Sequence, residues 1–168
     1  MSSIIETIDV DVPVRTAYDQ WTQFEDFPEF MDGVESIRQI DDTHLLWRAR
    51  VAGKDLEWRA EITEQTPDQR IAWKATEGAT NAGVVTFHRL DEGRTRVTLQ
   101  LDVEPEGIVE SVGDALGVVS RQVAGDLARF KTFIEDQGVA TGAWRGEVEQ
   151  DDTTDDLVSR ASETRANA

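Results

Sequence analysis

Few side chains in this sequence could act as a general acid, a general base or a nucleophile. There are two histidines, His44 and His88, one tyrosine, Tyr18, and no cysteine. The sequence contains no HExxH, GxSxG or Ser-His-Asp pattern and no cluster with metal-ligand spacing. The lack of cysteine also excludes disulfides and a thiolate nucleophile. We therefore expect no catalytic residue, no cofactor and no metal site.

The ionisable residues that do occur fall mostly on polar faces. Three charged residues of the stretch DLEWRAEIT share one face of a strand: Glu57, Arg59 and Glu61. They could polarise a carbonyl group only if this face turned inward, and we expect outward cross-strand pairs instead. His88 lies on the face opposite its neighbour Phe87, so it is expected to point to solvent. Tyr18 and Trp21 have helical spacing, which favours the edge of the core for Tyr18 over a general acid.

A long series of strands must position these side chains. From residue 34, for about 70 residues, apolar residues recur with a period of two and turn signals return about every ten residues. This pattern predicts six antiparallel strands. Residues 3–11 form an earlier strand that ends before Pro13. Every strand has one apolar face, and three successive strands carry a tryptophan on it: Trp47, Trp58 and Trp73.

Helical patterns flank the strands. Pro13 and the apolar spacing after it predict a short helix over residues 13–21, and the interruption at Pro28 predicts a second one over residues 23–31. Near the end of the chain, an apolar stripe with steps of three or four predicts a helix of about 29 residues, closed by Gly138. A sheet with one apolar face needs such a cover.

The length of 168 residues suits one domain with one core. We expect this domain over residues 1–140 and an acidic, disordered tail over residues 141–168. No signal-peptide pattern and no apolar run of about 18 residues is present, which indicates a cytoplasmic protein without stable membrane insertion.

Acidic residues outnumber basic ones by 34 to 17, which gives a net charge of -17. Because the acids are spread along the chain, they indicate a solvated, salt-tolerant surface, with an acidic patch for a basic partner as the alternative. Such a charge repels phosphate backbones and anionic lipids, so we expect no nucleic acid partner.

Four stretches together resemble one known family: VPVRTAYDQWTQFEDFPEFMDGVESI, GKDLEWRAEITEQTPDQRIAWKA, NAGVVTFHRL and VGDALGVVSRQVAGDLARFKTFIEDQG. Over about residues 3–148 the chain resembles the polyketide cyclase/dehydrase branch of the START-like (SRPBCC) superfamily, which is similar to coenzyme Q-binding proteins. The resemblance implies an α+β helix-grip fold, in which a curved seven-stranded antiparallel sheet surrounds a long C-terminal helix and a hydrophobic cavity. It does not imply one reaction, because the superfamily includes cyclases, lipid carriers and hormone sensors.

Apolar side chains from the strands and helices would line this cavity. The expected ligand-binding residues are Phe27, Phe30, Met31, Trp47, Trp58, Trp73, Phe87, Leu99, Val112, Leu116, Gly117 and Val119. In the segment FEDFPEFM, Phe27, Phe30 and Met31 would form a lid at the cavity mouth while the acidic residues meet water. The alternative is that these side chains plug the end of a filled core. The tryptophans are either plain core or a wall for a flat ligand.

Two further features each allow two interpretations. Gly113 and Gly117, one turn apart in the long helix, make a smooth strip that either lets the sheet approach closely or leaves room for a ligand. Trp144 and Arg145 stand between glycines in the stretch GAWRGEV. Trp144 either folds back onto the domain as an anchor or belongs to a docking motif for another protein.

Three functions follow as hypotheses. The first is non-catalytic binding or transport of a hydrophobic small molecule, such as a lipid, a quinone or a polyketide-like aromatic, by a monomer or weak homodimer. The second is a polyketide cyclase or dehydratase (aromatase), a lyase-type enzyme that would need an ionisable group inside the cavity. The third is a regulatory interaction protein that acts through its surface.

Overall fold

The computed structural model describes residues 2–51, 53–103 and 112–149, with side chains described at all of these except residues 2, 51 and 112–115. One sheet, two α-helices and a 3₁₀ helix account for the regular structure in these ranges. In chain order the elements are β1 (Ser2–Val10), α1 (Val14–Trp21), η1 (Phe24–Glu29), β2 (Val34–Gln39), β3 (His44–Val51), β4 (Lys54–Thr66), β5 (Arg70–Gly78), β6 (Asn81–Asp91), β7 (Arg94–Val103) and α2 (Val112–Gln137).

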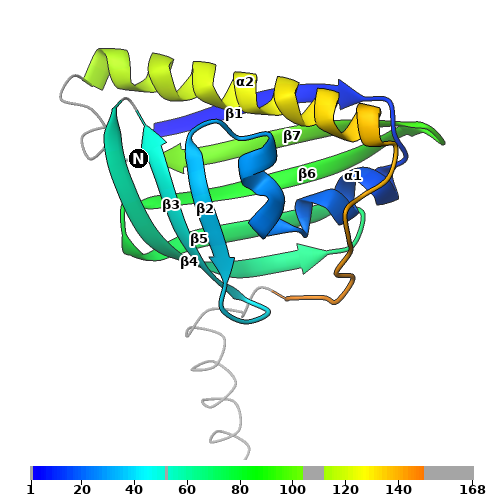
Figure 1. The fold of residues 1–168 in the computed structure, drawn as a ribbon, viewed down its shortest axis with the longest axis horizontal. Helices are drawn as coiled ribbons and strands as arrows, with labels where there is room; N and C mark the ends of the chain where they lie inside the picture. The colour runs from blue at the N-terminus through cyan, green and yellow to red at the C-terminus, as the bar shows by residue number, and fades with distance from the viewer. Residues whose placement is uncertain (1, 52, 104–111, 150–168) are drawn as a thin grey trace, which may run out of the picture.

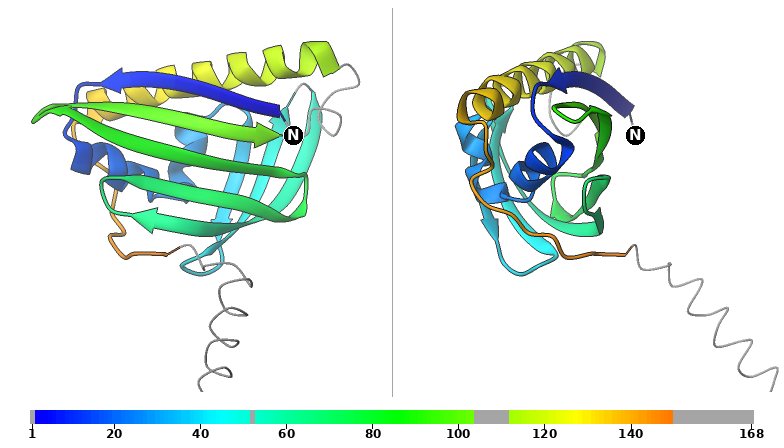
Figure 2. Two further views of the ribbon diagram at one scale, coloured as in Figure 1. Left: turned by 180° about the vertical axis from the view of Figure 1, so that it is seen from behind. Right: turned by 90° about the vertical axis from the view of Figure 1, so that its right-hand side faces the viewer.

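All seven strands form one antiparallel sheet in the order β1-β7-β6-β5-β4-β3-β2. Figures 1 and 2 show this sheet curling into a half-barrel, with α2 running across its open side next to β1. The two short helices follow the first strand and lie at one end of the half-barrel. The α+β helix-grip fold expected from the sequence is therefore confirmed.

The curvature of the sheet has a local cause in β4, a strand of 13 residues. The register between β4 and β5 shifts twice, between Arg59 and Ala60 and again between Ile62 and Glu64. A bulge bends its strand and increases the local right-handed twist. The two shifts therefore help to wrap the apolar face of the sheet around the interior.

The second short helix is tighter than expected. Residues Phe24–Glu29 form a 3₁₀ helix in place of the helix predicted over residues 23–31. Pro28 lies inside it and has no N–H group to donate to the carbonyl four residues earlier, which an α-helix would require. Because a 3₁₀ helix brings residues three apart onto one side, Phe24 and Phe27 share a face, and both are buried.

The long helix α2 spans 26 residues, which corresponds to about 39 Å at 1.5 Å per residue. Gly138 ends it with a φ of 68°, and the Gly138 N–H donates to the carbonyl of Ile134 at 2.8 Å. The predicted glycine cap is therefore confirmed. Within the described residues, no helix is both long enough and apolar enough to cross a membrane.

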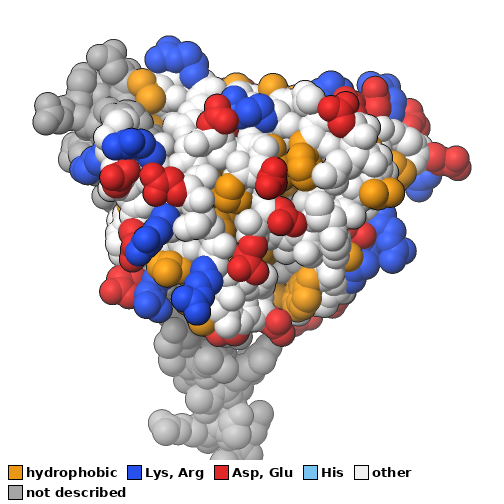
Figure 3. Space-filling view, viewed as in Figure 1, with side chains coloured by type: hydrophobic (Ala, Val, Ile, Leu, Met, Phe, Trp, Pro, Cys, Tyr) orange, Lys and Arg blue, Asp and Glu red, His pale blue; other side chains and the backbone are white. Residues whose placement is uncertain are grey.

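Charged side chains pair across neighbouring strands on the outer face of the sheet. Arg48 lies 3.0 Å from Glu57, and Arg59 lies 3.6 Å from Glu77. The outward cross-strand pairs predicted for Glu57 and Arg59 are thus confirmed, and His88 is exposed as predicted. Figure 3 shows acidic and basic side chains interspersed over the face in view, with apolar atoms in small separate areas.

The chain after α2 lies on the domain. We call residues 139–148 the C-terminal strap, most of which belongs to the stretch expected to be a tail. The N–H group of Trp144 in the strap donates to Thr22 Oγ1, just beyond α1, at 3.0 Å. Residues 150–168 of the expected tail lie outside the described residues.

Arg145 is the side chain that anchors the strap. Its guanidinium group contacts Asp19 Oδ1 at 2.6 Å and Asp68 Oδ2 at 2.9 Å, and it lies over the ring of Tyr18, 5.6 Å from the ring centroid. Asp19 is buried on α1. The GAWRGEV segment therefore folds back onto the domain, where the Arg145 side chain pairs with two carboxylates.

Replacing Arg145 with alanine should lower the free energy of unfolding by about 1–3 kcal/mol, because Asp19 and Asp68 lose a cation that hydrogen-bonds to both. The matched control is Arg48→Ala, which breaks an exposed pair and should cost less than about 1 kcal/mol. Urea denaturation followed by tryptophan fluorescence measures both values. Equal losses for the two variants would contradict the anchoring role of Arg145.

Candidate functional site

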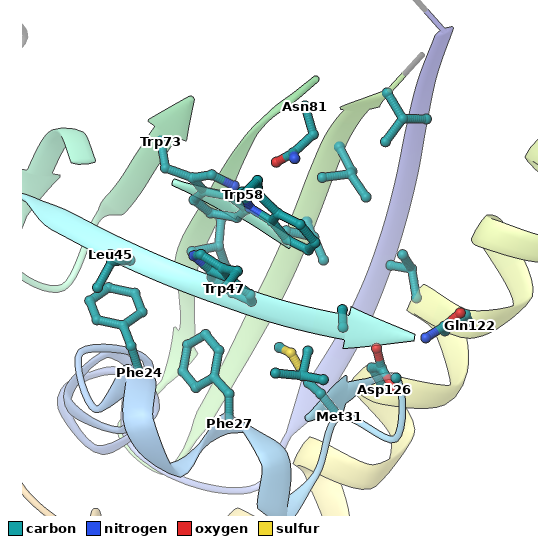
Figure 4. A pocket seen from close by; sticks show the side chains of 18 of the residues that line it. Phe24, Phe27, Met31, Leu45, Trp47, Trp58, Trp73, Asn81, Gln122 and Asp126 are labelled. Atoms are coloured by element: carbon teal, nitrogen blue, oxygen red, sulfur yellow. The ribbon is translucent and has the colours of Figure 1, made fainter. Parts of the chain in front are cut away.

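A cavity of about 150 Å³ lies between the concave face of the sheet, η1 and α2 (Figure 4). Strands β3 to β7 supply most of its wall. Side chains along a strand point alternately to its two faces, so every second residue of these strands faces the interior. Its apolar lining consists of Trp21, Phe24, Phe27, Met31, Val34, Leu45, Trp47, Ala49, Leu56, Trp58, Ile62, Ile71, Trp73, Ala79, Val85, Leu99, Leu101, Val103, Val119, Val123 and Leu127.

Two tryptophans stack on one wall of the cavity. Trp47 of β3 and Trp58 of β4 are direct partners in the antiparallel ladder, and their ring planes lie 11° apart with centroids separated by 5.5 Å. Their indole N–H groups are buried and have no hydrogen-bond partner among the described residues. The stacked pair therefore presents a flat aromatic surface that also carries these two unpaired N–H donors.

The third tryptophan lies flat against its neighbouring strand because that strand has a glycine there. Trp73 of β5 pairs with Gly83 of β6. A Cβ atom on Gly83 would lie only 2.4 Å from Cζ2 of the Trp73 indole. Gly83 was not among the residues expected at the site, although an isolated glycine inside a strand pattern is a signal of close approach.

The segment FEDFPEFM divides between two roles. Phe27 and Met31 line the cavity. Phe30 does not line it, and is only 1% exposed, because its ring packs against Phe130 at 5.2 Å and Phe133 at 5.3 Å on α2. Phe30 therefore fills the core between the short helix and α2, as the alternative interpretation held, while Phe27 and Met31 stay at the cavity wall.

The other expected site residues are also divided. Leu99 and Val119 line the cavity. Phe87 lies elsewhere in the core, with its ring 5.4 Å from that of Tyr18. Leu116 packs against the core without reaching the cavity. Tyr18 itself is fully buried away from the cavity, and this burial raises the pKa of its hydroxyl group.

Gly117 of α2 does not line the cavity. A Cβ atom on Gly117 would meet, among the described residues, only Nη1 of Arg121 at 3.8 Å. The described part of the sheet does not approach Gly117 closely, and Gly117 is not in the cavity lining. Neither interpretation of this glycine is therefore supported. The side chain of Val112 and the surroundings of Gly113 lie outside the described residues.

Polar side chains that the sequence interpretation missed lie at the ends of the cavity. Gln122 and Asp126 come from α2, Thr80 comes from the turn between β5 and β6, and Asn81 is the first residue of β6. Gln122 and Asp126 each stand next to a buried residue of the apolar stripe, which is the signal that could have identified them. Among the described residues, Asp126 is the only ionisable side chain in the lining.

Asp126 links α2 to the loop before β2. Its Oδ1 atom accepts hydrogen bonds from Arg129 and, at 3.3 Å, from the backbone N–H of Asp32. Arg129 also donates to the carbonyl of Phe30 at 3.1 Å and pairs with the Asp32 carboxylate at 3.3 Å. Burial raises the pKa of the Asp126 carboxyl above its ordinary value, and the hydrogen bond from Arg129 opposes this rise.

Substituting alanine for Gly83 should push the Trp73 indole away from β6 and toward the cavity. The clash should lower the free energy of unfolding by about 1–3 kcal/mol, and the near-ultraviolet circular dichroism of the tryptophans should change. Gly93→Ala, in the turn between β6 and β7, is the control because a Cβ there would meet, within the described part of the chain, only Asp91 Oδ1 at 3.9 Å. If Gly83→Ala changed neither the spectrum nor the stability, the close contact between the Trp73 indole and Gly83 would be contradicted.

The difference in free energy of unfolding between Asp126→Asn and the wild type should depend on pH. A carboxyl with a raised pKa holds its proton more tightly in the folded state, so ionisation destabilises the wild type as the pH rises above the ordinary value of 3.8. The variant lacks this loss. Its free energy of unfolding relative to wild type should therefore increase from about pH 4 to about pH 7.

Urea denaturation at several pH values measures this difference. Asp136→Asn, at an exposed position of the same helix, controls for the loss of one negative charge. A difference for Asp126→Asn that is constant with pH would show that burial does not perturb this carboxyl.

Comparison with known proteins agrees with this architecture. A family model described as polyketide cyclase / dehydrase and lipid transport matches residues 10–132. An uncharacterized 17.2 kDa protein of Streptomyces lincolnensis, from the melC2-rnhH intergenic region, is 58% identical over 149 residues, which cover 88% of this chain and 99% of the relative.

Two solved structures share the fold at low identity. The Zhui aromatase/cyclase of Streptomyces sp. R1128 has a TM-score of 0.68 at 17% identity and covers 85% of this chain and 99% of its own. A START superfamily protein from Mycobacterium smegmatis has a TM-score of 0.62 at 15% identity, and the match covers 80% of this chain and 95% of the other. Given the match of the family model to most of its length, this chain belongs to the polyketide cyclase/dehydrase and lipid transport family.

Proposed function

We propose that this protein binds a hydrophobic small molecule in the cavity and carries or sequesters it without changing it. The observation that supports this proposal is the cavity of about 150 Å³, whose lining is mainly apolar and includes four tryptophans. Protein interiors are usually packed like organic crystals, with few voids larger than a water molecule. At about 24 cal/mol per Å³, an empty space of about 150 Å³ costs about 3–4 kcal/mol of stability.

The size of the cavity limits the ligand. A dry apolar cavity of about 150 Å³ holds one benzene-sized ring, whereas most ligand pockets measure about 300–1,000 Å³. A ligand with a single ring fits the cavity as it stands. A lipid, a quinone or a polyketide-like molecule would have to displace cavity-wall residues such as Phe27 and Met31 or leave part of itself outside.

One observation favours a second candidate, a polyketide cyclase or dehydratase. Asp126 lies in the cavity lining, and a carboxyl with a raised pKa is suited to proton transfer. A dehydratase would remove water from a poly-β-keto chain as it closes a ring. Conversion of such a chain by the wild type, but not by Asp126→Asn, would favour this candidate over a carrier.

Filling the cavity tests the carrier directly. Ala49 is a buried lining residue on β3, so Ala49→Leu should occupy the space and prevent binding of p-xylene. A ligand at 100 times its dissociation constant stabilises the folded state by about 2.7 kcal/mol. Saturating p-xylene should therefore raise the melting temperature of the wild type but not that of Ala49→Leu.

Ala124→Leu provides the control, because Ala124 is exposed on α2 and the same side chain is added outside the cavity. This variant should respond to p-xylene as the wild type does. Native mass spectrometry of protein purified from its own host would then identify the ligand by mass. The proposal would be overturned if p-xylene did not raise the melting temperature of the wild type, or if it raised that of Ala49→Leu equally.

A further inference from the structure

Besides the indole N–H groups of Trp47 and Trp58, which no described residue pairs with, the cavity lining has polar side chains where α2 meets the loop before β2. Gln122 and Asp126 are four residues apart on α2, so they lie on the same face of that helix. Figure 4 shows both side chains at the same end of the cavity, beside Met31. At the opposite side, the amide of Asn81 already donates to the carbonyl of Ala79 at 3.0 Å.

The position of Gln122 depends on Gly33. A Cβ atom on Gly33 would lie 1.7 Å from Nε2 of Gln122, so the amide occupies the space that any other residue would fill. Gly33 itself is buried, and Gln122 is half-buried. The Gln122 amide has no hydrogen-bond partner among the described residues. It therefore offers a free donor and a free acceptor in the lining, next to Gly33.

Asp126 has one carboxylate oxygen in use and one available. Arg129 and the backbone N–H of Asp32 both donate to Oδ1. Among the described residues, the hydrogen bonds to this carboxylate all go to Oδ1 and none goes to Oδ2. The charged groups around this point are the carboxylates of Asp126 and Asp32 and the guanidinium of Arg129. With both carboxylates ionised, they leave one net negative charge.

A hydroxyl group matches this end of the cavity. It can donate its proton to the free oxygen of Asp126 and accept a hydrogen bond from the Gln122 amide, since a hydroxyl is one donor and two acceptors. An ionised carboxylate has no donor, and a carboxylate or a phosphate would meet the net negative charge. A purely apolar ligand would cover both polar groups without replacing the water that they lose.

We propose that the ligand of this cavity is an alcohol or phenol with an apolar body, and that its hydroxyl group binds between Gln122 and Asp126. This inference rests on the proposed function and specifies the chemical class of the ligand. The rest of the ligand lies against the stacked surface of Trp47 and Trp58. The Gln122 amide and the Asp126 carboxylate set its orientation, and they exclude anionic ligands.

Three probes of similar shape test the proposal: p-cresol, p-xylene and 4-methylbenzoate at neutral pH. Isothermal titration calorimetry gives their dissociation constants for the wild type, for Gln122→Leu and for Gln137→Leu. Gln137 is exposed at the end of α2, so this control places the same substitution on the same helix outside the cavity. The quantity compared is the ratio of p-cresol affinity to p-xylene affinity.

We expect Gln122→Leu to lower this ratio by about five- to tenfold, the loss of one net hydrogen bond, while Gln137→Leu leaves it unchanged. Gln122→Met, with an unbranched side chain of similar length, should give the same loss if the leucine variant folds poorly. The wild type should bind 4-methylbenzoate at least tenfold more weakly than p-cresol, and Asp126→Asn should reduce that difference.

The outcomes separate this inference from the proposed function. If p-xylene and p-cresol both bind the wild type but Gln122→Leu keeps the wild-type ratio, the hydroxyl site is overturned and the carrier function stands. Binding of 4-methylbenzoate as tight as that of p-cresol also overturns the hydroxyl site. If no probe binds the wild type, both the carrier function and the hydroxyl site are overturned.

Discussion

A straight helix laid across a curved sheet is the constraint on which the rest of this structure depends. The strands each have one apolar face, and the shifts of register in β4 help to curl that face inward. The helix α2 packs beside β1 along one edge of the half-barrel. A rod cannot follow the whole of a concave surface, so side chains must fill the space between them, and here they leave about 150 Å³ empty.

Aromatic residues fill one end of this interior and leave the other hollow. Near α1 the ring of Trp21 lies 5.4 Å from that of Phe130 and 5.1 Å from that of Phe27, and these packed rings close this end of the cavity. Toward the turn between β5 and β6 the wall is made of Trp47, Trp58 and Trp73, whose rings lie along the strands. The filled end supplies stability, and the hollow end supplies space for a ligand.

Two arginines hold the short helices in place beside the cavity. Arg129 joins α2 to the loop after η1 through the carbonyl of Phe30 and the carboxylate of Asp32. Arg145 joins the strap to the buried Asp19 of α1. Because α1 and η1 contribute side chains to the cavity lining, the shape of the cavity depends on ion pairs that lie outside it.

The sequence by itself determined the order of elements, the apolar face of each strand, the inward tryptophans and the glycine that ends α2. These features follow from periods of two and of three to four residues and from the chemistry of single residues, all of which are local.

Only the tertiary structure decided which inward residues meet the cavity. Phe27 and Phe30 belong to one apolar segment, yet only Phe27 reaches the cavity. A period specifies a face, but the position of the void depends on how far a curved sheet departs from a straight helix. The roles of Gly83 and Gln122 likewise depend on partners distant in the chain, Trp73 and Gly33, which register and helix packing bring into contact.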